Sequence, residues 1–187
     1  MQRDLETKLN QIVKQSFGEE SWNYKHTLLA VEWMRKLLEN EQGDSLILIT
    51  TMYLHDIGYS NILKKGYSFD ERETIKKKHM EIGAQYALNN LPNLGYTEQE
   101  TERIAHLISV HDNVEILESP DEILVMEADS LAMITWDKLK PSYNREDRER
   151  FMERFESRRL PKFRSKSGIR YVNELLIEAK RLNTIFC

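Results

Sequence analysis

The chain has 187 residues, which is long enough for one domain with a sizeable buried core. Hydrophobic residues make up 40% of it and charged residues 31%, a balance that excludes an intrinsically disordered chain. The net charge of -4 argues against a dedicated nucleic-acid binder. Cys187 is the single cysteine, so no disulfide can form within one chain, which fits a reducing compartment.

The N-terminal segment, MQRDLETKLNQIVKQ, is charged and does not contain the apolar core of a signal peptide. The longest apolar run lies around residues 46–54 and is much shorter than the roughly 20 residues that a membrane span needs. We therefore expect a cytoplasmic protein that has no membrane partner.

Apolar residues recur at helical spacing along most of the chain, and the alternation typical of strands is nearly absent. The predicted helices span residues 3–16, 24–40, 44–56, 73–89, 97–111, 120–136, 145–158 and 167–183. Asp44, Thr97 and Ser119 are the predicted N-caps, and Pro120 follows the last of them. Since no repeat or linker interrupts the pattern, we expect a single all-α domain over residues 1–187, a bundle of about 7–9 helices.

Two segments differ from this helical pattern. Residues 57–72 are predicted to form a long mixed loop, and loops of this length are often functional. Residues 158–170 contain six basic residues and no acidic one, which indicates either a solvated surface or part of a binding site for an anion.

Helical spacing also sorts the five histidines, because residues three, four and seven apart share one face of a helix. His26, His55, His79 and His111 each share a face with apolar residues of their predicted helices. His106 lies roughly 140° from His111, at about 100° per residue, and so faces outward. Four of the five imidazoles are therefore expected to point into the core.

Two aspartates accompany these imidazoles. Asp56 follows His55 at the end of the most hydrophobic predicted helix, and Asp129 is surrounded by apolar residues on its own turns. Any one of the six could be a hydrogen-bonded core residue, but a lone buried carboxylate is costly. Several buried imidazoles and carboxylates together need a common partner, and a divalent cation supplies one. The pattern predicts a metal site.

The string TTMYLHDIGYS around His55 and Asp56 resembles the signature of the HD-domain superfamily, in which an apolar helix ends in His-Asp. The order of the other residues is also similar. WNYKHTLLAVEWM contains His26, while HMEIGAQYA, RIAHLISVHD and VMEADSLAMI contain His79, His111 and Asp129. The resemblance covers about residues 20–136, and we expect the C-terminal helices of residues 137–187 to pack on this core.

The resemblance implies a metal-dependent phosphohydrolase that hydrolyses a phosphoester or phosphoanhydride by metal-activated water. Its catalytic residues would be Asp56, His79 and His111. It implies a first ion held by His26, His55, Asp56 and Asp129, and a second ion or a phosphate at His79 and His111. The mixed nitrogen and oxygen donors suit one or two ions of Mn, Fe, Ni, Co or Zn.

The expected partner is a small phosphorylated substrate, a nucleotide in the first instance, and no nucleic acid. Many relatives have Lys or Arg where this chain has Tyr59, so the phosphate contacts must come from elsewhere. We expect them from Lys65 and Arg72 in the loop beside the site. The other basic candidates are Lys25, Lys64, residues 76–78, Arg158, Arg159, Lys162, Arg164 and Lys166.

Two alternatives to a hydrolase stay open at this point. The same residues would serve a non-catalytic module that senses a metal or a nucleotide, and a di-iron oxygenase also occurs on the same fold. The sequence does not specify the oligomeric state, and exposed apolar helix ends are compatible with a homodimer.

Overall fold

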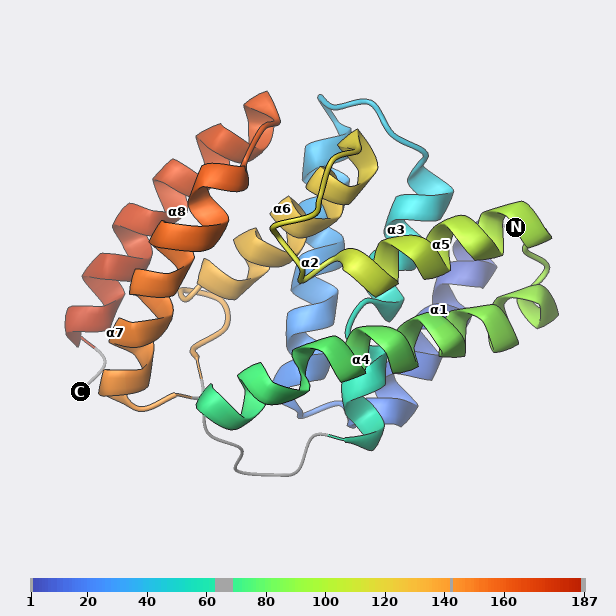
Figure 1. Ribbon diagram of the computed structural model, residues 1–187, viewed down its shortest axis with the longest axis horizontal. Helices are drawn as coiled ribbons and strands as arrows, with labels where there is room; N and C mark the ends of the chain where they lie inside the picture. The colour runs from blue at the N-terminus through green and yellow to red at the C-terminus, as the bar shows by residue number, and fades with distance from the viewer. Residues whose placement is uncertain (1, 63–68, 142, 186–187) are drawn as a thin grey trace.

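The computed structural model describes residues 2–62, 69–141 and 143–185, and over these ranges it contains helices and no strand (Figure 1). The α-helices are α1 (Gln2–Phe17), α2 (Trp22–Leu38), α3 (Ser45–Leu54), α4 (Phe69–Asn90), α5 (Glu98–Val110), α6 (Pro120–Ile134), α7 (Arg145–Arg154) and α8 (Lys166–Ile185). The shorter elements are the 3₁₀ helices η1 (Ile57–Asn61), η2 (Leu91–Leu94) and η4 (Leu160–Lys162) and the π-helical turn η3 (Phe155–Arg159). The predicted all-α bundle is confirmed.

The predicted N-caps begin three of these helices. The Asp44 carboxylate accepts hydrogen bonds from the backbone N–H groups at the start of α3. Thr97 with Glu100, and Ser119 with Glu122, form reciprocal capping boxes at the start of α5 and α6. Each box satisfies two backbone groups that a helix start leaves without a partner.

The prediction of one long loop over residues 57–72 is wrong at both ends. Residues 57–61 form η1, and α4 begins at Phe69, four residues before the predicted start. Asp70 and Glu73 in the first turns of α4 pair with Arg150 and Arg154 of α7. These ion pairs join residues 80 and 81 positions apart, so the local sequence does not reveal them.

Helix α3 forms the centre of the core. Its residues 47–54 are all buried, and it packs against α1, α2, α5 and α6. This position explains why α3 is apolar on every side, whereas α1 and α5 have one apolar face each. None of the helices in the described ranges is both long enough and apolar enough to cross a membrane.

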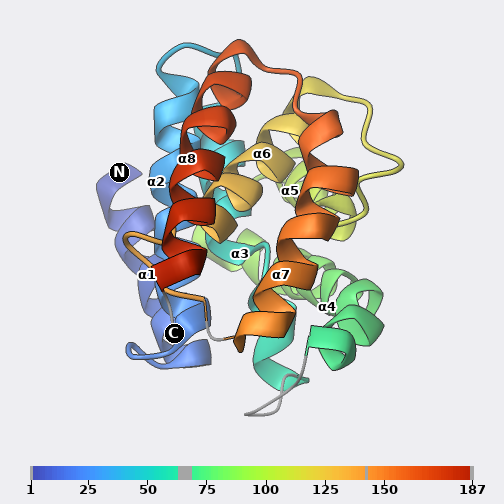
Figure 2. The ribbon, with the colours of Figure 1, turned by 90° about the vertical axis from the view of Figure 1, so that its left-hand side faces the viewer.

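Residues 143–185 form a C-terminal arm of α7, η3, η4 and α8, which lies at one end of the molecule (Figures 1 and 2). Helix α8 packs on α6. The buried carboxylate of Glu127 on α6 accepts hydrogen bonds from the backbone N–H groups of Arg164 and Ser165 at 2.7 and 2.9 Å. Gly168 lies against the same carboxylate, where a Cβ would come within 2.2 Å of its Oε2.

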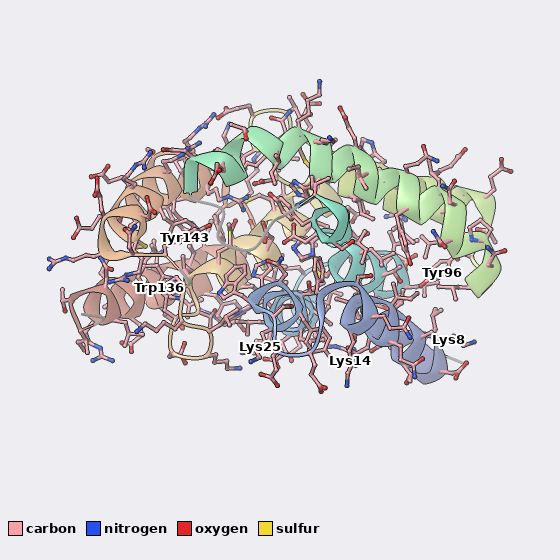
Figure 3. All side chains as sticks on the ribbon, turned by 90° about the horizontal axis from the view of Figure 1, so that it is seen from below. Lys8, Lys14, Lys25, Tyr96, Trp136 and Tyr143 are labelled. Atoms are coloured by element: carbon pink, nitrogen blue, oxygen red, sulfur yellow. The ribbon has the colours of Figure 1, made fainter. Side chains whose placement is uncertain are left out.

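Aromatic rings join the arm to the end of α6. Trp136, just after α6, and Tyr143 both lie near the ring of Phe151 on α7, with centroids 6.2 and 6.3 Å away. Figure 3 labels Trp136 and Tyr143 at this end of the molecule. These contacts hold α7 beside the cleft described below.

Candidate metal centre

His55 lies at the C-cap of α3, where the helix leaves its last carbonyl groups without backbone partners. Its Nδ1–H donates to the carbonyl oxygen of Met52 at 2.8 Å. This bond fixes the ring and leaves Nε2 to face the other members of the cluster.

His111 repeats the arrangement at the C-cap of α5. Its Nδ1–H donates to the carbonyl oxygen of Ile108, also at 2.8 Å. In both places an aspartate, Asp56 or Asp112, is the next residue as the chain leaves the helix. Two helix ends therefore present the same pair of side chains to one region.

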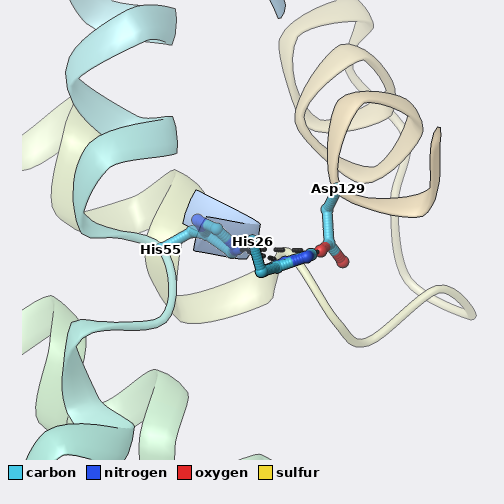
Figure 4. A group of neighbouring side chains, drawn as sticks. All are labelled: His26, His55 and Asp129. Carbon is cyan, nitrogen blue, oxygen red and sulfur yellow. Dashed lines mark hydrogen bonds and ion pairs between the residues drawn. The ribbon is translucent and has the colours of Figure 1, made fainter. Parts of the chain in front are cut away.

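The first cluster consists of His26, His55, Asp129 and one oxygen of Asp56. The Nε2 of His26 lies 3.0 Å from Oδ1 of Asp129 and 3.4 Å from Nε2 of His55. The Nε2 of His55 lies 3.6 Å from the same Asp129 oxygen. Figure 4 shows the side chain of His26 between those of His55 and Asp129. The three residues belong to α2, the C-cap of α3 and α6. Oδ2 of Asp56 lies 3.5 and 3.8 Å from the Nε2 atoms of His55 and His26.

The second cluster forms around the other oxygen of Asp56. Its Oδ1 lies 3.4 Å from Nε2 of His79 and 3.6 Å from Nε2 of His111. These two Nε2 atoms are 3.4 Å apart. Asp56 therefore faces one pair of imidazoles with each carboxylate oxygen.

The donors of both clusters fit divalent transition metals. His55 and His111 each donate Nδ1–H to a backbone carbonyl, so Nε2 is the ring atom left to bind a cation in place of a proton. Ligands bound at about 2.0–2.2 Å to one ion lie roughly 2.8–3.6 Å from one another in octahedral or tetrahedral geometry. The separations of 3.0–3.8 Å in the clusters are close to that range. The residues thus meet the geometric demand of a metal as well as its chemical one.

A comparison with protein-family models matches residues 23–134 to the HD domain. This match spans more than half of the chain and includes every residue of the two clusters. The chain belongs to the HD domain family. No curated protein and no solved structure matched the chain. HD domains generally bind divalent metals and are generally hydrolases, so the family and the geometry agree on the kind of site.

The charges of this HD site hold its acids ionised. Burial would raise the pKa values of Asp56 and Asp129, but the surrounding imidazoles and, for Asp129, the Arg159 guanidinium lower both well below the usual range. Burial would likewise lower the pKa of His55, yet the negative charges of Asp56 and Asp129 raise it to about 9. Burial prevails at His79, whose pKa is lowered.

Two further aromatic rings hold the histidines that have no hydrogen bond at Nδ1. Trp22 stacks on His26 with ring centroids 4.8 Å apart, and Tyr59 stacks on His79 at 3.8 Å. The Nδ1 atoms of His26 and His79 are buried without a hydrogen-bond partner among the described residues. Each cluster thus contains one imidazole fixed by a backbone carbonyl and one fixed by stacking.

The clusters open into a cleft of about 160 Å³. One wall comes from the helices before the arm and includes Trp22, Tyr59 and Met133. The opposite wall comes from the C-terminal arm: Tyr143, Phe151, Arg154, Phe155, Arg158 and Arg159. The arm lies outside the matched residues 23–134. The chain therefore completes the cleft of the family domain with its own C-terminal segment.

The structure brings all six predicted metal ligands together, and it places His106 on the surface with 57% of its side chain exposed. Lys65 and the side chain of Arg72 lie outside the described residues, so their contact with substrate stays a prediction. Sequence reasoning missed Asp112 and did not single out Arg159, both of which lie at the site. The only signal for Asp112 was its place directly after His111, a predicted metal ligand.

Proposed function

We propose that this HD domain is a metal-dependent phosphohydrolase that hydrolyses a phosphoester or phosphoanhydride of a small phosphorylated molecule, a nucleotide in the first instance. One observation carries the proposal. Asp56 links two clusters of metal-type donors at the floor of a cleft that also contains basic side chains. Two metal ions held side by side, with basic side chains nearby, would neutralise the negative charge of a phosphate group.

His26, His55, Asp56 and Asp129 would hold one divalent ion, and His79 and His111 would share a second with Asp56. Bound there, the ions would supply an activated water and neutralise phosphate charge. We propose Asp56, His79 and His111 as the catalytic residues, since they lie together on the side of the site formed by α4 and α5.

The chain's own groups prepare this chemistry. The backbone carbonyls fix the rings of His55 and His111, so their donor atoms are in place before any ligand arrives. Asp56 and Asp129 are ionised at neutral pH because their pKa values are lowered, and His79 is uncharged because burial lowers its pKa. The site therefore requires little reorganisation to bind cations and then an anion.

The walls of the cleft support a small substrate. A volume of about 160 Å³ lies below the roughly 300–1,000 Å³ usual for drug-sized ligands. The rings of Tyr143, Phe151 and Phe155 offer apolar surface to the part of the substrate beyond the phosphate. A mononucleotide combines a phosphate with a flat ring that such surface can contact.

The test is phosphate release by protein freed of metal and reconstituted separately with Mn, Fe, Ni, Co or Zn, against nucleotides and general phosphatase substrates. We expect turnover with at least one metal, lost in His55→Ala and Asp56→Ala and retained in His106→Ala, which alters an exposed imidazole. Absence of turnover with every metal would refute the proposal. Nucleotide binding without product would then indicate a sensing module, and oxygen consumption by a di-iron form would indicate an oxygenase.

A further inference from the structure

Asp112 lies between two cations at the edge of the metal centre. Its Oδ1 accepts a hydrogen bond from Nη2 of Arg159, and its Oδ2 lies 3.3 Å from Nζ of Lys76. Only 7% of the Asp112 side chain is exposed. One buried carboxylate therefore holds two positive groups beside the ligand histidine that precedes it.

Arg159 reaches this place from the C-terminal arm. Its Nη1 donates to Oδ2 of Asp129 at 2.9 Å and to Oγ of Ser130 at 2.7 Å, while 8% of its side chain is exposed. These bonds and the one to Asp112 use three of the five N–H groups of the guanidinium, and no other hydrogen bond of Arg159 occurs among the described residues. Arg159 ends the π-helical turn η3, a distortion that often marks functional sites.

Lys76 reaches the same place from α4. It lies one turn before His79, so the two side chains share a helix face. Its Nζ pairs with Oε1 of Glu73 at 2.9 Å as well as with Asp112, and 30% of its side chain is exposed. Lys76 and Arg159 both line the cleft.

We propose that Arg159 and Lys76 bind the phosphate group of the substrate, and that Asp112 holds both cations in position until it arrives. The proposal rests on the proposed function, because it concerns the anion that the metal centre would process. Arg159 offers two donors in a planar fork, which matches phosphate oxygens, and Lys76 offers a point charge from the opposite side.

A purely structural role explains the pair less well. Replacing a buried ionic network by packed apolar residues is often neutral or stabilising, so stability alone does not account for a buried arginine here. Arg154 and Arg158 also line the cleft, but 38% and 54% of their side chains are exposed and they pair with Glu73 and Glu115. Among the four, only Arg159 and Lys76 contact Asp112 or a predicted metal ligand in the described part of the chain.

The test is calorimetric titration of inorganic phosphate into the full chain loaded with Mn²⁺. The two variants are Lys76→Gln, which removes the charge, and Arg159→Lys, which keeps the charge but removes the planar guanidinium. Each has a matched control on the surface: Lys77→Gln, with 87% of its side chain exposed, and Arg145→Lys, with 73% exposed. Bound manganese is measured in every sample by elemental analysis.

We expect each variant to weaken phosphate binding at least about tenfold at unchanged manganese content, as loss of a charge-assisted hydrogen bond predicts, while the controls bind as the unmodified chain does. If Arg159→Lys fails to fold or loses metal, the phosphate affinity of Lys76→Gln alone tests the proposal. Unchanged phosphate affinity in Lys76→Gln, or no binding of phosphate by the unmodified manganese-loaded chain, would overturn the proposal. Failure of the proposed function has a different signature: phosphate binding that depends on Lys76 and Arg159, without turnover of any substrate.

Discussion

Gly58 lies where η1 crosses α4, and its lack of a side chain allows the two backbones to approach closely beside the candidate metal centre. A Cβ on Gly58 would lie 2.0 Å from the carbonyl oxygen of His79 and 2.9 Å from the backbone nitrogen of Gly83. Both neighbours are backbone atoms in the middle of a helix, so neither can rotate away. Gly58→Ala must therefore push η1 and α4 apart.

The size of the effect follows from these distances. Non-bonded heavy atoms lie about 3.5–4.0 Å apart at their optimum, so the two elements must separate by more than about 1 Å. Overpacking of this kind costs about 3 kcal/mol, which lowers the melting temperature by roughly 6–12 °C in a chain of this length. The same movement would separate Asp56 from His79, and a misplacement of about 1 Å can cost about 100-fold in rate.

Thermal unfolding, metal content and turnover of Gly58→Ala are the measurements, with Gly83→Ala as the control. A Cβ on Gly83 would meet a methyl group of Ile108 at 3.0 Å, which requires a shift of only a few tenths of an ångström, and alanine favours the helix by roughly 1 kcal/mol. We expect Gly83→Ala to melt near the unmodified chain. Our account of the crossing is wrong if Gly58→Ala also melts there and keeps its metal.

Two pH-dependent predictions follow from the charges. Metal binding at pH 7 should release about one proton, because the pKa of His55 is raised to about 9 and the ring must lose its proton to coordinate. Metal affinity should therefore rise with pH up to about 9. A calorimetric heat of binding that does not depend on the ionisation enthalpy of the buffer would contradict this prediction. Burial would raise the pKa of Glu122, but hydrogen bonds from the backbone of Glu118 and Ser119 and the His106 imidazole lower it to about 2. The ionised Glu122 carboxylate therefore stabilises the fold fully above pH 4.5, and this contribution is lost as the pH falls towards 2. Urea titrations should show that the difference in unfolding free energy between the unmodified chain and Glu122→Gln shrinks over that pH range. A difference that stays constant would exclude the ionised carboxylate as the source of the stabilisation.

The sequence predicted the residues whose surroundings are local. Helical spacing identified His26, His79 and Asp129 as inward-facing, because apolar residues lie three or four positions away on the same helix face, and all three are buried. The caps at Thr97 and Ser119 were predictable for the same reason, since each needs one partner three residues along.

The rest depends on contacts between distant segments. Arg159 belongs to a run of basic residues whose composition left open a solvated surface or an anion-binding site. It is buried because Asp129 and Asp112, 30 and 47 residues away, accept its hydrogen bonds. The first turns of α4 likewise pair with distant residues, on α7. Local patterns contain no information about which distant residue will neutralise a charge.

The ends of α3 and α5 at His55 and His111 have an electrostatic consequence for the order in which ligands can enter. The C-terminus of an α-helix carries about half a negative charge from its aligned peptide dipoles. Two such ends converge here with the ionised groups of Asp56 and Asp129. These negative groups favour a dication beside Asp56, where it would replace the proton that His55 carries below about pH 9. Under the proposed function, binding would be ordered: metal enters first and adds the positive charge that draws an anionic substrate to the two helix ends.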